Sequence, residues 1–178
     1  MRWIISLVLA WPLLAQALTL QQYVAQPERY GPVVMLRHAL APGGGDPDHF
    51  DVGDCSTQRN LNSVGRKQSQ TLGKQLSAVG WKPEQVLSSP WCRCLETAEL
   101  MGLGQVEAEA GLASFFEGHV DREGTLERLN QVMAGLDGPT LMVTHFVVIS
   151  AVTGLGVGSG EAVVYNPETH QSWRLEIN

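Results

Sequence analysis

The chain has 178 residues, which is enough for one domain with a sizeable core. Apolar residues make up 44% of it and charged residues 17%, so disordered and fibrous chains are excluded. The formal net charge is -6, and lysine and arginine form no run. This charge pattern argues against a nucleic-acid-binding protein and against a polybasic membrane-surface protein.

Residues 1–17 have the features of a cleaved export signal. Arg2 gives a positive start, residues 3–14 are almost wholly apolar, and residues 15–17 form a small-x-small cleavage pattern. A retained membrane anchor is the alternative, but the apolar stretch is shorter than the roughly 20 residues that span a bilayer. We therefore expect a signal peptide over residues 1–17, a single domain over 18–178, a periplasmic location and no stable membrane span.

The first expected strand covers residues 32–36, a continuous apolar run that stops at Arg37 and His38. Such a run is typical of a strand buried on both faces. Residues 41–55 follow as a loop too rich in glycine, proline and aspartate for a helix or strand. The loop carries three closely spaced acids, Asp46, Asp48 and Asp51. Their spacing does not fit an EF-hand, so we expect a solvated loop and no metal.

Apolar residues at helical spacing predict a first helix over residues 61–79. A short strand follows at residues 86–87. Ser89 is a candidate N-cap and Pro90 suits a first helical turn, so a second helix should run from there to about Met101.

A third helix is expected around residues 126–136, where apolar residues again have helical spacing. Residues 140–143 form another apolar strand that ends shortly before His145, and a helix-like stretch covers residues 146–154. Two strands close the chain, near residues 161–165 and 172–177.

The order of these elements predicts a three-layer α/β/α fold with a mostly parallel, doubly wound sheet, to which the last two strands add an antiparallel edge. Ligands bind such sheets beyond the carboxyl ends of the strands. His38 and His145 follow buried strands closely, and Arg93 comes soon after a third strand. We therefore expect these three side chains to meet at one edge of the sheet.

Together these residue types suit phosphoryl transfer, although singly each has an ordinary structural interpretation. Arginines offer forked donors that match phosphate oxygens. One neutral histidine can accept phosphate as a nucleophile, and a second, protonated histidine can stabilise the transferring phosphoryl group. The sequence has no Walker loop, dinucleotide fingerprint or Gly-x-Ser-x-Gly elbow, so nucleotide-binding and esterase functions lack support.

Four motifs in register resemble the histidine phosphatase superfamily, the phosphoglycerate-mutase-like group. They are Leu36-Arg37-His38-Ala39, the stretch from Leu61 to Gln68, the stretch from Ser88 to Ala98, and Val143-Thr144-His145. The resemblance spans nearly the whole chain after the signal. It implies a phosphomonoesterase with a phosphohistidine intermediate, acting without a metal or an organic cofactor.

The resemblance also implies roles for individual residues. The implied phosphate pocket consists of the acceptor His38 with Arg37, Arg93 and His145. Arg59 and Asn60 fall where family members often touch the phosphate or the substrate. For these two residues a role at the helix entry, with Asn60 as the N-cap, is an equal alternative.

The proton donor is the main departure from the family pattern. Many members carry a glutamate after the third strand, at the position where this chain has Ser114. Glu161, then Glu117, then Asp121 are the candidates to replace it, although each can equally be a solvated charge. Compact phosphohistidine phosphatases also lack this acid, and their leaving group needs little protonation.

The export signal and the cysteine-bearing motifs make the chain look closest to small envelope members, such as lipopolysaccharide core heptose phosphate phosphatase. The first expected substrate is therefore a small envelope sugar phosphate, such as a lipopolysaccharide core sugar. A broad phosphomonoesterase is one alternative. A phosphate-binding or envelope-interaction module with weak or no turnover is another, and the missing acid keeps that alternative open.

The chain has three cysteines, and export would place them in an oxidising compartment. We expect Cys55 to pair with either Cys92 or Cys94, which would tie the glycine-rich loop to the helix that carries Arg93. Three reduced thiols are the alternative.

Overall fold

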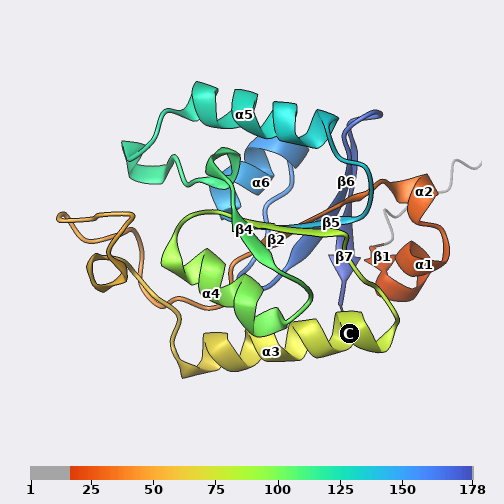
Figure 1. Cartoon of the computed structure of the whole chain (residues 1–178), viewed down its shortest axis with the longest axis horizontal. Helices are drawn as coiled ribbons and strands as arrows, with labels where there is room; N and C mark the ends of the chain where they lie inside the picture. The colour runs from red at the N-terminus through yellow and green to blue at the C-terminus, as the bar shows by residue number, and fades with distance from the viewer. Residues whose placement is uncertain (1–16, 178) are drawn as a thin grey trace, which may run out of the picture.

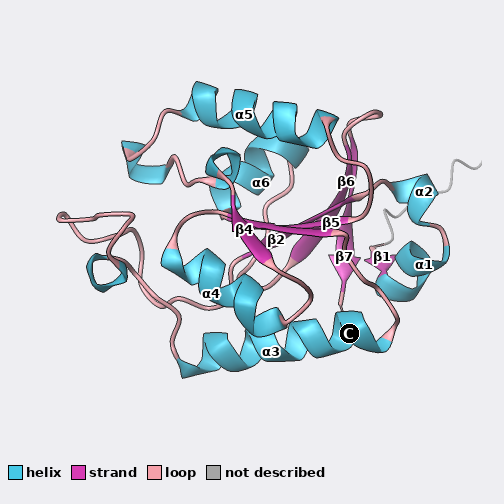
Figure 2. Ribbon diagram, in the orientation of Figure 1, coloured by secondary structure: helices cyan, strands magenta, loops and turns pink. Residues whose placement is uncertain are grey.

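A seven-stranded sheet forms the middle layer of the molecule (Figures 1 and 2). The computed structural model describes residues 17–177, so nearly all of the expected signal peptide lies outside the described residues. The strands are β1 (Leu18–Thr19), β2 (Val33–Arg37), β3 (Gln85–Ser88), β4 (Val106–Ala108), β5 (Thr140–Thr144), β6 (Ala162–Asn166) and β7 (Gln171–Glu176). Their order is β1-β7-β6-β2-β5-β3-β4. Only the pairings of β6 are antiparallel, which confirms a mostly parallel sheet.

Helices cover both faces of this sheet, as Figure 1 shows. They are α1 (Leu20–Ala25), α2 (Pro27–Tyr30), α3 (Ser63–Ala78), α4 (Cys92–Met101), α5 (Arg122–Ala134) and α6 (Phe146–Thr153). The pair α3 and α4 lies along one face, and α5 and α6 lie along the other. The predicted three-layer α/β/α architecture is therefore confirmed. Among residues 17–177, no helix combines the length and apolar character needed to cross a membrane.

Alternate residues of the central strands face the two helical layers. In β2, Val34 and Leu36 pack in the cluster that includes α3 and α4, whereas Val33 and Met35 pack against α5 and α6. All four side chains are fully buried. A strand covered on both faces needs apolar residues at every position, which is why this stretch is continuously apolar.

The start of α4 differs from the prediction that Ser89 caps it and Pro90 forms its first turn. The helix begins at Cys92, and Trp91 is its N-cap residue. Ser89 instead extends the sheet pairing by one residue, because its N–H donates to the Val143 carbonyl at 2.8 Å. The sheet ladder therefore holds Ser89, and the helix starts later.

The alternative in which Asn60 caps α3 is wrong. Asn62 is the N-cap residue, and its side chain accepts a hydrogen bond from the Gly65 N–H at 2.9 Å. The Asn60 side chain donates instead to the carbonyls of Cys55 and Gln58. Asn60 thus stabilises the preceding loop.

The edge of the sheet was predicted incompletely. β6 pairs antiparallel with β2 and β7, as the terminal pair was expected to do, but β1 lies outside β7 as the edge strand. β1 has only two residues, too few for a strand signal in the sequence. The helix that follows it begins with a capping box between Thr19 and Gln22.

Candidate active site

The register of two parallel strands places the two motif histidines side by side. β2 pairs with β5 so that Arg37 lies opposite Thr144, and one further residue sets His38 opposite His145. The His38 N–H donates to the Thr144 carbonyl at 3.0 Å, which continues the ladder to the histidines. The two ring centroids are 5.5 Å apart.

Both histidines line a cavity of about 380 Å³ beyond the carboxyl ends of β2 and β5. Three arginines share this cavity with them, namely Arg37, Arg59 and Arg93. A larger hollow of about 900 Å³ lies at the opposite ends of these strands, beside Pro32 and Pro139. Its lining acids are Glu28, Asp137 and Glu168. The smaller cavity is therefore the better site for an anion.

His38 is held as a neutral ring with one free nitrogen. A carbonyl oxygen can only accept, so the 2.8 Å contact between Nδ1 and the Ala39 carbonyl places the ring proton on Nδ1. Burial lowers the pKa of His38 to about 3, against the opposing effect of that hydrogen bond, and the charges of Arg93, Arg59 and Arg37 lower it further. Nε2 consequently carries a lone pair at neutral pH.

His145 is also neutral in this arrangement. It is 4% exposed, and burial, followed by the charge of Arg93, holds its pKa well below the usual range. Its Nε2 lies 2.8 Å from the Ser89 hydroxyl, which also accepts a hydrogen bond from the Trp91 N–H. A bound phosphoryl group would favour the protonated imidazole, because an adjacent negative charge raises a histidine pKa.

The arginines are anchored by protein oxygens but keep donors for a ligand. Arg37 Nη1 donates to the Val157 carbonyl at 3.0 Å, and Arg59 donates to the carbonyls of Gly45 and Ala41. The Nε atoms of Arg37 and Arg93 are buried without a hydrogen-bond partner among the described residues. Burial is the main cause that lowers the pKa of Arg37 and Arg59, and the neighbouring Arg93 guanidinium adds to it. Guanidinium groups that lower one another's pKa in this way favour the binding of an anion beside them.

Other predicted site residues lie away from the cavity. Asn60 does not line it, and neither Glu117 nor Glu161 does. Glu117 accepts a hydrogen bond from the Asp46 N–H at 2.9 Å, and Glu161 accepts one from the Gly158 N–H at 2.7 Å. Asp121 caps α5 through the Gly124 N–H. Each of these acids therefore has a structural contact in this state.

Two polar side chains of the site, those of Ser89 and Asp46, were not expected there. Ser89, predicted as a helix cap, contacts His145. Asp46, predicted as part of a solvated loop, lines the cavity with its side chain only 3% exposed, so that expectation was wrong for this residue. Nothing in the sequence separates Asp46 from Asp48 and Asp51, because only the folded chain brings Arg93 against it.

Asp46 also belongs to a group of three potential metal ligands. Ligand atoms of Asp46, Glu117 and His119 all lie within 4.8 Å of one another. However, both Asp46 oxygens already accept hydrogen bonds from Arg93. A carboxylate paired with a guanidinium suits a cation poorly, so these residues fit a loop anchored by protein donors better than a metal site.

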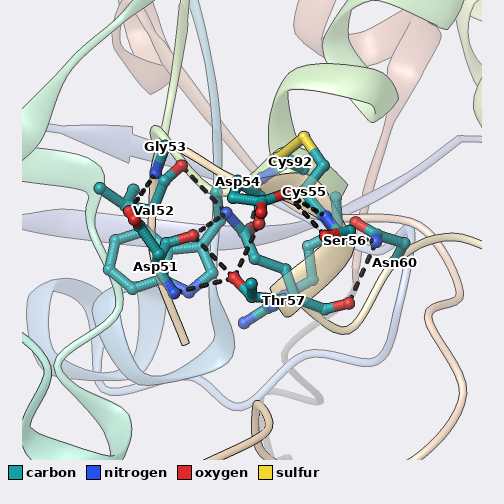
Figure 3. The surroundings of a disulfide bond; sticks show 12 residues. Asp51, Val52, Gly53, Asp54, Cys55, Ser56, Thr57, Asn60 and Cys92 are labelled. Atoms are coloured by element: carbon teal, nitrogen blue, oxygen red, sulfur yellow. Dashed lines mark hydrogen bonds between the residues drawn. A yellow bond between two sulfur atoms is a disulfide. The ribbon is translucent and has the colours of Figure 1, made fainter. Parts of the chain in front are cut away.

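A disulfide joins Cys55 to Cys92, as Figure 3 shows. The expectation that Cys55 pairs with one of the two later cysteines is confirmed, and the partner is the first of them. Cys94 is buried and free. The disulfide fastens the loop before α3 to the first turn of α4, one residue from Arg93.

Comparison with known proteins shows the family of the chain. Residues 33–132 match the model of the histidine phosphatase superfamily (branch 1). The chain belongs to this superfamily. The matched segment contains His38, the loop and all three arginines of the cavity.

Curated relatives match over part of their length. The serine/threonine-protein phosphatase Pgam5 of Drosophila yakuba is 32% identical over 77 residues, which cover 43% of this chain and 24% of that protein. The Drosophila virilis Pgam5 is 30% identical over 88 residues, covering 49% of this chain and 27% of that protein. The chain thus spans about a quarter of the length of these relatives.

Solved structures share the fold of this superfamily member. The protein histidine phosphatase SixA in complex with tungstate has a TM-score of 0.56 at 18% identity, covering 80% of this chain and 92% of SixA. A mycobacterial glucosyl-3-phosphoglycerate phosphatase has a TM-score of 0.51 at 17% identity, covering 80% and 95%. At such identities the likeness concerns the fold.

Proposed function

We propose that the protein is an exported phosphatase that hydrolyses a phosphomonoester through a phosphohistidine on His38. One observation carries this proposal: the neutral His38 ring, with its proton fixed on Nδ1, lines the same cavity as three arginines. A nucleophile with a free lone pair and a cluster of forked cations are the two parts that phosphoryl transfer requires.

The first step forms a bond from His38 Nε2 to phosphorus and breaks the bond from phosphorus to the leaving oxygen. The electron pair of that bond stays on the leaving oxygen, which takes a proton from water or from the substrate itself. Arg37, Arg59 and Arg93 neutralise the phosphoryl oxygens, and His145, which takes a proton from solvent when the substrate phosphate binds, joins them as the charge develops. A water molecule then attacks phosphorus, the bond from phosphorus to Nε2 breaks with its electron pair returning to His38, and the water proton passes to the departing inorganic phosphate.

The proposals for the location of the protein and for its substrate class rest mainly on the sequence. Export is supported by the signal-like residues 1–17 and by the Cys55–Cys92 disulfide, because disulfides persist in oxidising compartments. An envelope sugar phosphate, such as a phosphorylated lipopolysaccharide core sugar, would meet the protein there. A broad phosphomonoesterase would suit the same cavity.

One observation favours a second candidate, a phosphate-binding module with little turnover. The only carboxylate that lines the cavity, among residues 17–177, is Asp46, and it is paired with Arg93. An alkoxide leaving group then has no carboxylic acid poised to protonate it.

A turnover screen with a trapping experiment separates the two candidates. The purified exported form is offered phosphorylated sugars, phosphopeptides and aryl phosphates, and the reaction is quenched without acid because phosphohistidine is acid-labile. We expect turnover, and a phosphoryl group on His38 by peptide mass spectrometry. The His38→Ala variant should lose both, whereas His49→Ala, at an exposed position in the loop, should retain both. Phosphate binding without turnover on any substrate would favour the module.

A further inference from the structure

The Asp46 carboxylate is completely enclosed by hydrogen-bond donors. Oδ1 accepts from Arg93 Nη1 at 2.7 Å and from the Arg59 N–H at 3.0 Å. Oδ2 accepts from Arg93 Nη2 at 3.1 Å and from Trp91 Nε1 at 3.1 Å. The side chains of Asp46 and Arg93 are each 3% exposed. This ion pair is therefore bidentate and largely buried beside the cavity.

A guanidinium group presents two forked edges, and Asp46 uses only one of them. The Nη1–Nη2 edge binds the carboxylate, and Nη1 also donates to the Arg59 carbonyl at 3.3 Å. Nε–H, on the other edge, is buried with no partner in the described part of the chain. The Nε–H and the second Nη2–H form a fork that matches two oxygens of one phosphoryl group. A buried, unpaired donor on a cavity-lining arginine indicates a ligand atom that belongs there.

We propose that Asp46 is a positioning residue that fixes the Arg93 guanidinium by one edge and leaves the opposite edge for the phosphoryl oxygens of the substrate. The proposal rests on the proposed function and deepens it, because it adds a residue of the glycine-rich loop to the phosphate-binding machinery. Asp46 acts through Arg93 and makes no contact with the reacting atoms.

The alternative role for a buried carboxylate in this place is a competing anion that substrate must displace. The loop contacts argue against it. The Cys55–Cys92 disulfide holds the loop on α4, and the Cys92 N–H donates to Gln58 Oε1 at 2.9 Å (Figure 3 shows the disulfide). Phe50 stacks on Trp91 with ring centroids 5.1 Å apart. Release of Asp46 would break its four hydrogen bonds and strain these attachments.

The two roles predict opposite signs for one measurement. Removing a negative charge beside an anion site tightens anion binding if that charge only competes with the ligand. If Asp46 positions Arg93, the Asp46→Asn variant should bind inorganic phosphate at least about tenfold more weakly, because an amide cannot hold the guanidinium by two charged contacts. Asp48→Asn is the matched control, since it removes the same charge from an exposed position of the same loop. It should leave phosphate affinity unchanged.

The experiment is titration calorimetry of inorganic phosphate into the folded chain and its variants. In an Arg93→Ala background, Asp46→Asn should cause no further loss of affinity, because its effect passes through Arg93. Trp91→Phe removes one donor to Asp46 and keeps an aromatic ring, so it should also weaken phosphate binding, by a smaller factor than Asp46→Asn. It replaces Asp46→Asn as the test if that variant does not fold. Unchanged or tighter binding in Asp46→Asn, or a loss that adds fully to that of Arg93→Ala, overturns the proposal. Because phosphate affinity is measured without turnover, a wild-type protein that binds phosphate but hydrolyses nothing would refute the phosphatase alone.

Discussion

His38 and His145 follow neighbouring parallel strands at matching positions, so the register of β2 on β5 sets the distance of 5.5 Å between their ring centroids. Both rings are nearly inaccessible to solvent, and both lie among arginines. The sheet therefore delivers two neutral imidazoles to a strongly cationic cavity, and this has consequences for stability as well as for chemistry.

The first prediction concerns stability at acid pH. An unfolded histidine titrates near pH 6.5, whereas burial lowers the pKa of His38 to about 3 and that of His145 also falls well below its usual range. Below pH 6.5 the unfolded chain thus binds more protons than the folded chain, and the free energy of unfolding falls as the pH falls. His38 contributes a slope of up to about 1.4 kcal/mol per pH unit, fully present above pH 6.5 and progressively lost toward pH 3, and His145 acts in the same direction.

Urea unfolding of His38→Asn between pH 7 and pH 4 measures this contribution. Between pH 7 and pH 4 the free energy of unfolding should fall less in the variant than in the wild type. The difference between the two decreases should equal the contribution of His38. His49→Asn is the control, because this side chain lies at an exposed position of the loop. Parallel pH profiles for the wild type and His38→Asn would contradict a neutral, buried His38.

The second prediction concerns the orientation of His145. The Ser89 hydroxyl lies 2.8 Å from His145 Nε2, and the Cys94 thiol contacts the same nitrogen at 3.5 Å. Ser89→Ala should lower kcat/KM by about 5–10-fold, because the ring loses one hydrogen bond of ordinary strength. Ser88→Ala is matched in size and burial, and its hydroxyl donates only to the Ser89 carbonyl. Equal losses in the two variants would indicate a packing defect and not a loss of orientation.

The third prediction concerns the disulfide. Cys55 and Cys92 are 37 residues apart, and closing a loop of this size stabilises by about 4 kcal/mol in the chain-entropy model. The Cys55→Ser/Cys92→Ser double variant should lose most of this stability in denaturant unfolding. Because the disulfide also holds the loop that carries Asp46, we expect its phosphate affinity to fall.

Alkylation provides the direct check of this pairing. Without reductant, and after denaturation, the wild-type protein should expose one reactive thiol, on Cys94. Three alkylated cysteines in protein isolated from the periplasm would contradict both the disulfide and the proposed location. Cys94→Ala should retain the disulfide and is the control for cysteine loss alone.

The sequence predicted those parts of the fold that are coded locally. The central strand at residues 33–37 could be recognised because burial on both faces demands an unbroken apolar run. Because the strands before His38 and His145 were predicted to be parallel, both histidines were expected at the same edge of the sheet. The cysteine positions limited the expected disulfide partner of Cys55 to Cys92 or Cys94. Only the folded structure shows that the partner is Cys92 and that Cys94 is free.

The contacts between distant segments could not be read from the sequence. Three aspartates in the loop look alike, and Asp46 is singled out only because Arg93 lies against it in the folded chain. Ser89 resembles a helix cap, but pairing with the sheet overrides that local preference. Short elements such as β1 are held by their neighbours and carry no periodicity of their own.

The last prediction concerns the leaving group. In a loose transition state for phosphoryl transfer, much of the negative charge develops on the leaving oxygen. A positioned acid typically accelerates such a step by about 10²–10⁴-fold. Ser114 lines the cavity where the family often has that acid, and the lining carboxylate Asp46 is unsuited to the role. Although burial opposes its ionisation, hydrogen bonds from Arg93, Arg59 and Trp91 outweigh this effect and lower the Asp46 pKa.

Without a carboxylic acid at the leaving oxygen, the rate of phosphoenzyme formation should fall steeply as the pKa of the leaving alcohol or phenol rises. Rapid-quench kinetics on a series of aryl and alkyl phosphates measures this slope. Glu161→Gln should leave it unchanged, because that side chain is 60% exposed and does not line the cavity. Glu117→Gln should also leave it unchanged, since Glu117 contacts the Asp46 backbone and not the cavity. A shallow slope in the wild type that becomes steep in one of these variants would identify that glutamate as the proton donor, brought to the substrate by a loop movement.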